Sequence, residues 1–205
     1  MYKFFFLFLN LLIGNLFAQS IVKIPIQNPS FEGAAREAST PKGWQACGSY
    51  STPDILPGVW GVAMQANNGK TFVGLTARED NTFEAMGQAL ATPLKANECY
   101  TVSIDLARSD AYASYNRPIR LRVWGGTTQG QKKYLLGSSP TISNTAWKRY
   151  SLYFFPRNEI KYIILEAHYA EGYTAPYRGN ILLDHLGDLE TCIRASTEKL
   201  EIGNK

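Results

Sequence analysis

Residues 99–107 read CYTVSIDLA, and apolar and polar side chains alternate along this stretch. Every even-numbered residue from Tyr100 to Leu106 is apolar, and every odd-numbered residue from Thr101 to Asp105 is polar. Successive side chains of an extended chain point to opposite faces, so this period of two predicts a β-strand with one buried face.

Short apolar or alternating runs of the same kind recur between turn signals along the rest of the chain. They are TFVGLTA (71–77), EAMGQALATPL (84–94), IRLRVWGG (119–126), KKYLLGSS (132–139), WKRYSLYFF (147–155), KYIILEAHY (161–169) and NILLDHLGDLE (180–190). Pro and Gly interrupt every window long enough for a helix of average length, and no apolar stripe of helical period is present. Strands at this spacing predict an all-β sandwich or barrel.

The first 18 residues have the pattern of a secretory signal peptide. One positive charge at Lys3 precedes an apolar run from Phe4 to Phe17, and the small residue Ala18 follows. A membrane anchor is the alternative, but Asn10 and other polar or small residues interrupt the run, which is shorter than the ~20 residues of a spanning helix. We therefore expect an exported chain without a transmembrane span in its mature form, placed in the periplasm, on the outer-membrane surface or outside the cell.

The remaining sequence predicts one domain over residues 19–193, followed by a polar tail over residues 194–205. The formal net charge is +4, and basic residues are interspersed with acidic ones. Because no basic run is present, a nucleic-acid partner is not indicated.

Several motifs, taken in order, resemble those of a known family. The opening NPSFEG (28–33) with a downstream GW (43–44), the central CYTVSIDLARS (99–109) and the closing GNILLDHLGDLE (179–190) resemble successive strands of galactose-binding-like jelly-roll carbohydrate-binding modules. WQACG, GLTARED, LRVWGG and YRGNILLD further resemble a domain of bacterial envelope proteins. The resemblance implies a jelly-roll sandwich of two antiparallel sheets, with NPSFEG as the first strand.

The resemblance also implies a site for one structural calcium ion between the first and last strands. Many such modules hold the ion with a Glu and an Asp at the positions of Glu32 and Asp184 here, and hard oxygen ligands suit calcium. In the alternative interpretation, Glu32 is a solvated carboxylate and Asp184 stabilises a turn. No other cofactor is expected.

Cys47, Cys99 and Cys192 are the three cysteines, and their spacing does not match a metal site. In an exported protein a disulfide is the expected use. The strands that Cys99 opens and Cys192 closes are antiparallel neighbours in related jelly rolls, so the resemblance favours a bridge between these two. Cys47 would then be unpaired and buried, although its pairing with either of the others remains an alternative.

Catalytic motifs are absent from the sequence. There is no G-x-S-x-G, no H-E-x-x-H and no phosphate-binding glycine loop, and His168 and His185 both fall inside predicted strands. Some jelly rolls are glycosidases, so four carboxylates are candidates for an acid and base pair. They are Glu79, Asp80, Glu84 and Glu166.

Ligand binding has a stronger candidate in two tyrosine-rich loops, 108–118 and 168–180. If the flanking strands are antiparallel neighbours, as the resemblance implies, these loops meet at one end of the sandwich. Planar rings stack on pyranose faces, while guanidinium and carboxylate groups bind hydroxyls. The candidate ligand-binding residues are Arg108, Asp110, Tyr112, Tyr115, Tyr169, Tyr173, Tyr177 and Arg178. The alternative is that these tyrosines only cover the end of the core.

Among the tryptophans, Trp124 and Trp147 are expected to pack, and Trp60 could extend a binding face. The sequence therefore predicts a non-catalytic exported module that binds carbohydrate, either a polysaccharide or a cell-envelope glycan. The first alternative is a protein-interaction subunit of a cell-envelope complex that uses the same loops. A glycosidase-like enzyme is the third interpretation.

Overall fold

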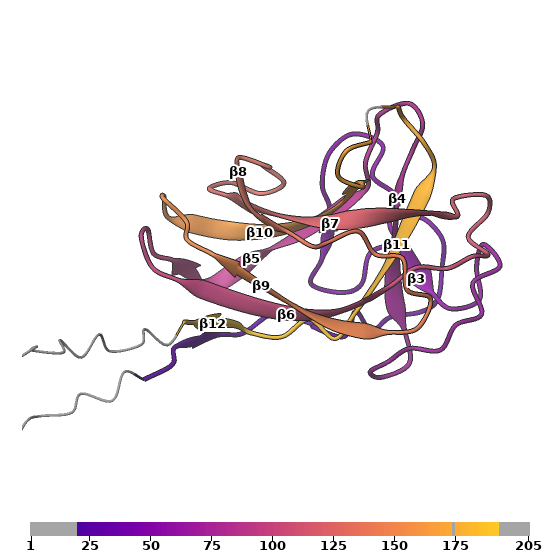
Figure 1. Cartoon of the computed structure of the whole chain (residues 1–205). Coiled ribbons are helices and arrows are strands. Elements are labelled where there is room, and N and C mark those ends of the chain that lie inside the picture. The colour runs from indigo at the N-terminus through magenta and orange to yellow at the C-terminus, as the bar shows by residue number, and fades with distance from the viewer. Residues whose placement is uncertain (1–19, 174, 193–205) are drawn as a thin grey trace, which may run out of the picture.

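A computed structural model describes residues 20–173 and 175–192, which contain twelve β-strands (Figure 1). The expected signal peptide and the expected polar tail from residue 194 lie outside the described residues. Each of the eight runs that the sequence predicts as strands contains a strand. Within the described part of the chain, no helix has the length and apolar character needed to cross a membrane.

The strands form two layers that face each other. The β6 sheet consists of β1 (Lys23–Ile24), β3 (Asp54–Leu56), β4 (Phe72–Ala77), β6 (Tyr100–Ala107), β9 (Lys148–Phe154), β11 (Gly179–Asp184) and β12 (Leu189–Thr191). The β10 sheet consists of β2 (Gln45–Ala46), β5 (Ala85–Leu94), β7 (Arg117–Gly126), β8 (Tyr134–Ser138) and β10 (Ile160–Tyr169), in the order β2-β5-β10-β7-β8. Figure 1 shows β5, β7 and β10 in one layer and β6 and β9 in the other.

The two layers are not fully separate, which differs from the expected pair of purely antiparallel sheets. β11 and β7 pair in parallel over two residues each, which joins the layers into one mixed sheet. Gly179 permits this approach, because a Cβ there would lie 2.3 Å from Ile119 Cγ2 and 2.6 Å from the Arg117 carbonyl oxygen. Every other strand pair is antiparallel.

The core lies between the layers and follows the predicted alternation. The even-numbered residues of β6 from Tyr100 to Leu106 are buried, as are Leu121 and Val123 of β7 and Leu165 of β10. These apolar side chains are buried between the two sheets and drive their packing. The stabilisation is about 25 cal/mol per Å² of apolar area removed from water.

The NPSFEG segment is a turn, so its prediction as the first strand is wrong; β1 precedes it at Lys23–Ile24. The Asn28 carboxamide oxygen accepts a hydrogen bond from the Glu32 amide at 2.9 Å, and the Asn28 carbonyl accepts one from the Phe31 amide at 3.1 Å. These local bonds replace a strand ladder. The Phe31 ring is buried against Trp44, with centroids 5.2 Å apart.

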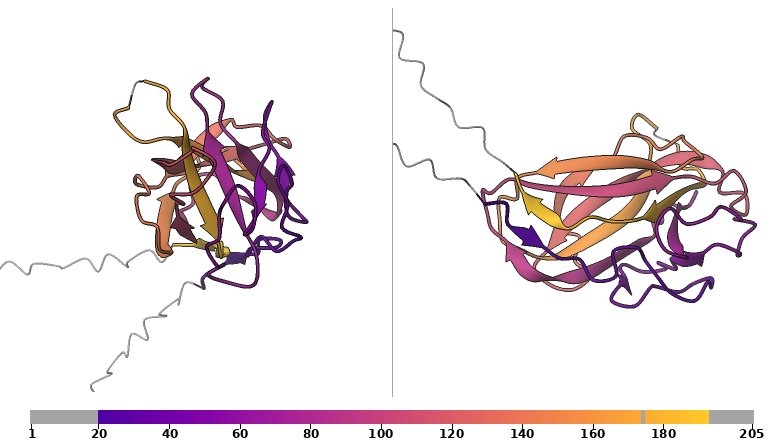
Figure 2. Two further views of the ribbon diagram at one scale, coloured as in Figure 1. Left: turned by 90° about the vertical axis from the view of Figure 1, so that its right-hand side faces the viewer. Right: turned by 90° about the horizontal axis from the view of Figure 1, so that it is seen from below.

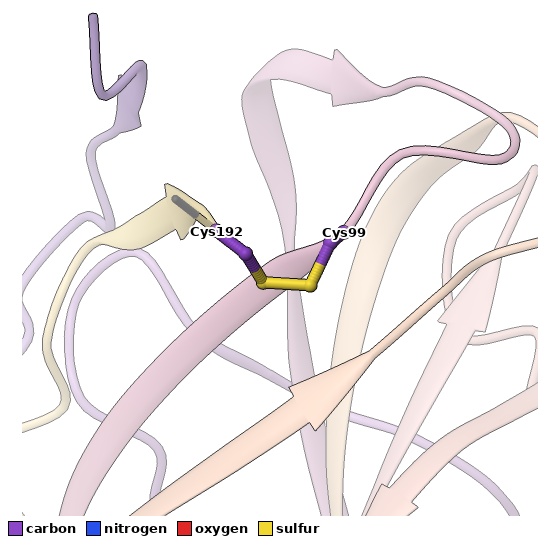
Figure 3. The surroundings of a disulfide bond; sticks show 2 residues. All are labelled: Cys99 and Cys192. Atoms are coloured by element: carbon purple, nitrogen blue, oxygen red, sulfur yellow. A yellow bond between two sulfur atoms is a disulfide. The ribbon is translucent and has the colours of Figure 1, made fainter. Parts of the chain in front are cut away.

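Cys99 and Cys192 form the expected disulfide (Figure 3). Their Cα atoms are 5.2 Å apart, and the Cys192 amide also donates a hydrogen bond to the Cys99 carbonyl. Cys47 is free and buried, and burial raises the pKa of its thiol to about 11. The thiol therefore stays protonated near neutral pH and packs as a small apolar group.

Candidate functional site

The two tyrosine-rich loops meet at one end of the sandwich, as the sequence predicts. The Asn180 side-chain amide donates hydrogen bonds to the carbonyls of Ser109 and Tyr115, at 2.7 and 2.5 Å. The Arg117 amide donates to the Arg178 carbonyl at 3.3 Å. Asn180 is fully buried, so the junction is part of the interior.

Three of the predicted ligand-binding tyrosines are core residues, so the expectation of exposed rings is wrong for them. Tyr112, Tyr169 and Tyr177 are exposed by only 2, 6 and 4%. The hydroxyl of Tyr112 donates to Asp54, and that of Tyr169 donates to the Arg78 carbonyl. The rings of these tyrosines are packed in the core, and their hydroxyls bond to other groups of the protein. These tyrosines therefore stabilise the loops and offer no platform for sugar stacking.

The other predicted loop residues lie nearer the surface, and each of them contacts another side chain. Tyr173 is 54% exposed, and Tyr115 is half-buried with the Arg178 guanidinium 5.5 Å from its ring centre. Arg178 forms an ion pair with Glu79, and Arg108 forms one with Asp110. The end loops therefore offer one well-exposed ring among the tyrosines that the sequence assigns.

The two residues expected to hold calcium, Glu32 and Asp184, both accept hydrogen bonds from the loop at residues 67–71. Glu32 Oε1 accepts hydrogen bonds from two backbone amides of residues 70–71, at 2.9 and 3.2 Å. Asp184 accepts from the amides of residues 67–68, at 2.7 and 2.8 Å, and from that of His185 at 2.6 Å. In the described residues, no group of three or more His, Cys, Asp or Glu could hold a metal.

Chelation should therefore leave the melting temperature unchanged. The amides of the loop 67–71 already stabilise both carboxylates, and a cation would have to displace these hydrogen bonds. Thermal melts with and without EDTA, monitored by circular dichroism, test this expectation. The expectation would be contradicted if EDTA lowered the melting temperature and added calcium restored it. Such a result would indicate that the protein binds calcium.

A second group of side chains lies on the outer face of the β10 sheet, directed away from the core. We call this surface the β10 face. It carries Arg120, Arg122 and Trp124 of β7 and Tyr162, Ile164, Glu166 and His168 of β10. The register places Arg122 opposite Glu166 and Trp124 opposite Ile164, so these side chains are direct cross-strand neighbours.

Glu166 is a buried carboxylate near the middle of this face. The Trp124 indole N–H donates to its Oε2 at 2.6 Å, and the Lys132 ammonium forms an ion pair with its Oε1. Arg122 lies beside them with its guanidinium 6.0 Å from the Trp124 ring, and burial together with Arg120 lowers its pKa. The face thus combines a planar ring with charged groups held in fixed positions.

A cavity of about 300 Å³ opens next to this cluster. Its lining includes Tyr162, the glutamines Gln45, Gln88 and Gln129, and Gly87. A Cβ at Gly87 would come within 2.7 Å of the Ile163 carbonyl oxygen and of Ile164, so a larger residue cannot replace it without displacing β10. Amide donors and acceptors around an aromatic ring suit hydroxyl-rich ligands.

From the sequence, Trp124 is expected to pack and Glu166 is one of four candidate acid and base residues, but the contact between them is not predicted. The alternation itself held a signal: Arg120, Arg122 and Trp124 take alternate positions in IRLRVWGG, and Glu166 and His168 do so in KYIILEAHY. Polar or amphipathic residues at alternate positions mark an outward face. Strand order, which the sequence does not show directly, decides that the two faces adjoin.

No protein-family model and no curated protein matches the chain. Among solved structures, the CBM22-1 xylan-binding domain of Xyn10C from Paenibacillus barcinonensis superposes with a TM-score of 0.51 at 17% identity. The match covers 86% of this chain and 97% of that domain. The fold is the jelly roll of carbohydrate-binding modules.

The same jelly roll serves proteins of different activity. Fisc, a Stig cyclase from Fischerella sp. TAU in complex with a pyrrolidinylidene-indole, matches with a TM-score of 0.59 at 16% identity, covering 86% of this chain and all of that one. An arabinose-bound α-L-arabinofuranosidase matches with a TM-score of 0.57 at 11% identity, covering 82% of this chain and 26% of that one. At such identities the likeness establishes the fold, and function depends on the site.

Proposed function

We propose that the protein is an exported, non-catalytic module that binds a polysaccharide or cell-envelope glycan across the β10 face. The observation that carries the proposal is the cavity of about 300 Å³, lined by Tyr162 and by glutamines, beside the Trp124 and Glu166 cluster. Ring and amide groups on a rigid sheet are the chemistry that recognises pyranose rings and hydroxyls. A xylan-binding domain with the same fold supports a polysaccharide as the ligand.

A non-catalytic role is supported by the contacts of the four carboxylates that are candidates for an acid and base pair. Glu84 forms an ion pair with Arg78. Glu166 forms an ion pair with Lys132 and accepts a hydrogen bond from Trp124. Glu79 pairs with Arg178, and Asp80 accepts hydrogen bonds from Thr82 in a turn. Because each carboxylate has its own structural partners, these contacts favour structural roles over the acid and base pair of a glycosidase.

Tyr162→Ala should weaken glycan binding about fivefold, because ring stacking contributes roughly 1 kcal/mol. The glycan is first chosen from an array of plant, bacterial and host polysaccharides, and the affinity is then measured by isothermal titration calorimetry. Tyr153→Ala is the matched control, since Tyr153 is 68% exposed and belongs to β9 of the other sheet. Equal losses in both variants would contradict the placement on the β10 face, and an array without any bound glycan would contradict glycan binding itself.

A protein partner in an envelope complex is a second candidate, favoured by a separate apolar surface. Leu135 and Phe155 are 48 and 65% exposed and line a cavity of about 490 Å³ between β8 and the turn after β9. Exposed apolar groups around a hollow are typical of protein interfaces. A blank glycan array together with a stoichiometric partner recovered from envelope extract, and lost in Phe155→Ala, would favour this candidate.

A further inference from the structure

A separate cavity of about 320 Å³ lies at the end of the sandwich, which we call the end pocket. It is lined by three aromatic residues, Trp60, Tyr112 and Tyr115, and by four charged residues, Glu37, Asp54, Arg78 and Glu84. None of these residues belongs to the proposed glycan site on the β10 face. A cavity that joins aromatic walls to buried titratable groups is the usual form of a small-molecule site.

The backbone holds the three rings in place. The Ala113 amide donates to the Trp60 carbonyl at 3.2 Å, and the Tyr115 amide donates to the Tyr112 carbonyl at 2.7 Å. Tyr112 is buried, Tyr115 is half-buried, and Trp60 remains 46% exposed. An indole at the mouth of a cavity loses contact with water when a ligand covers it, which favours binding.

Negative charge predominates around the end pocket. Asp54 and Glu84 are 5 and 2% exposed, and Glu37 adds an exposed carboxylate to the lining. Arg78 is the single cationic side chain among the lining residues of the described chain, and it is already paired with Glu84. The electrostatic field inside the cavity therefore favours a cation over an anion or a neutral molecule.

The carboxylates already have hydrogen-bond donors from the protein. Asp54 accepts from the Ala38 amide at 2.8 Å and from the Tyr112 hydroxyl. Glu84 accepts from the Thr52 hydroxyl at 2.8 Å, from the Thr76 amide at 2.9 Å and from Arg78. A ligand with N–H groups would compete with these donors, whereas a quaternary ammonium has no hydrogen to donate and is held by charge and ring faces alone.

We propose that the end pocket binds a small quaternary ammonium compound. The partly exposed rings of Trp60 and Tyr115 contact its methyl groups, and the buried carboxylates supply the counter-charge without direct hydrogen bonds. Recognition of quaternary ammonium groups by aromatic rings is well suited to a cavity of this size.

The ionisation of Glu84 should make this binding depend on pH. Burial raises the pKa of Glu84 to about 7, and the nearby Asp54 carboxylate adds to the rise, while Arg78 opposes it. Burial holds the pKa of Tyr112 well above its usual value, so its hydroxyl stays neutral. Glu84 is uncharged below its pKa and anionic above it, so cation affinity should rise as the pH passes from about 6 to about 8.

The test compares choline with its uncharged isostere 3,3-dimethylbutan-1-ol, each titrated into the protein and followed by calorimetry and by amide NMR shifts. Choline should bind saturably, the alcohol should not, and choline affinity should increase several-fold between about pH 6 and about pH 8. Trp60→Ala should weaken choline binding by roughly tenfold. Tyr153→Ala, which removes a 68% exposed ring outside the pocket, is the matched control and should leave choline binding unchanged.

Three outcomes would overturn the proposal: no saturable binding of choline, equal affinity for the alcohol, or an affinity unchanged by Trp60→Ala. Glu84→Gln keeps the size of the side chain and should abolish the pH step. If that variant does not fold, the comparison of choline with the alcohol in the native chain and in Trp60→Ala still decides the question, because Trp60 is partly exposed.

Discussion

Replacing Tyr112 with alanine should lower the free energy of unfolding by about 3 to 5 kcal/mol, whereas Tyr173→Ala should change it little. Tyr112 is 2% exposed and packs so closely that a Cβ on Gly74 would lie 2.5 Å from its hydroxyl. Tyr173 is 54% exposed, so its truncation removes little buried area. The two variants compare the same residue change in two neighbouring loops.

Urea denaturation of both variants and of Tyr112→Phe measures these effects. Tyr112→Phe keeps the ring but removes the donor to the buried Asp54 carboxylate, which should cost about 1 to 3 kcal/mol. The expected order of stability is native, Tyr173→Ala, Tyr112→Phe and then Tyr112→Ala. If Tyr173→Ala destabilised the protein as much as Tyr112→Ala, the assignment of a core ring and a surface ring would be wrong.

Removal of the disulfide should produce the second large effect. The bond between Cys99 and Cys192 closes a sequence separation of 93 residues, and a cross-link of this length stabilises by about 4.6 kcal/mol on the chain-entropy model. The double variant Cys99→Ala, Cys192→Ala should melt about 10 °C lower than the native protein. Differential scanning calorimetry gives both the melting temperature and the enthalpy of unfolding.

Reduction provides the control for this variant. Dithiothreitol should lower the melting temperature of the native protein by a similar amount and leave the double variant unaffected, since the remaining Cys47 is unpaired. Native protein that melts at the same temperature with and without the reductant would contradict a stabilising role. Non-reducing peptide mapping should recover Cys99 and Cys192 in one linked peptide.

The strands were predictable because local alternation reports burial directly. In β6, the apolar even positions from Tyr100 to Leu106 are all buried, so the sequence pattern and the core coincide. The turn at residues 28–33 was not predictable in the same way. There the Asn28 side chain forms a hydrogen bond with a backbone group that would pair with a neighbouring strand in a sheet. Side-chain capping of this kind depends on a local geometry that residue type alone does not determine.

The functional surface was harder to predict because burial of an aromatic residue depends on tertiary contacts. Tyr112 and Tyr173 occupy similar loops in the sequence, yet one lies in the core and the other at the surface. Glu166 and Trp124 are 42 residues apart, and only the β7 and β10 register brings them together. Tyrosine enrichment thus indicated where the loops meet but did not distinguish structural rings from exposed ones.

The pairing of β1 with β12 makes this domain suited to circular permutation. Lys23 lies opposite Glu190, and the Thr191 amide donates to the Val22 carbonyl, so a short turn could connect the two strands as a hairpin. Figure 2 shows both strands at one extremity of the sandwich. New chain ends could then be opened in the exposed turn at residues 157–159, which precedes β10. Fusion partners attached at these new ends would leave β1 and β12 joined as a hairpin.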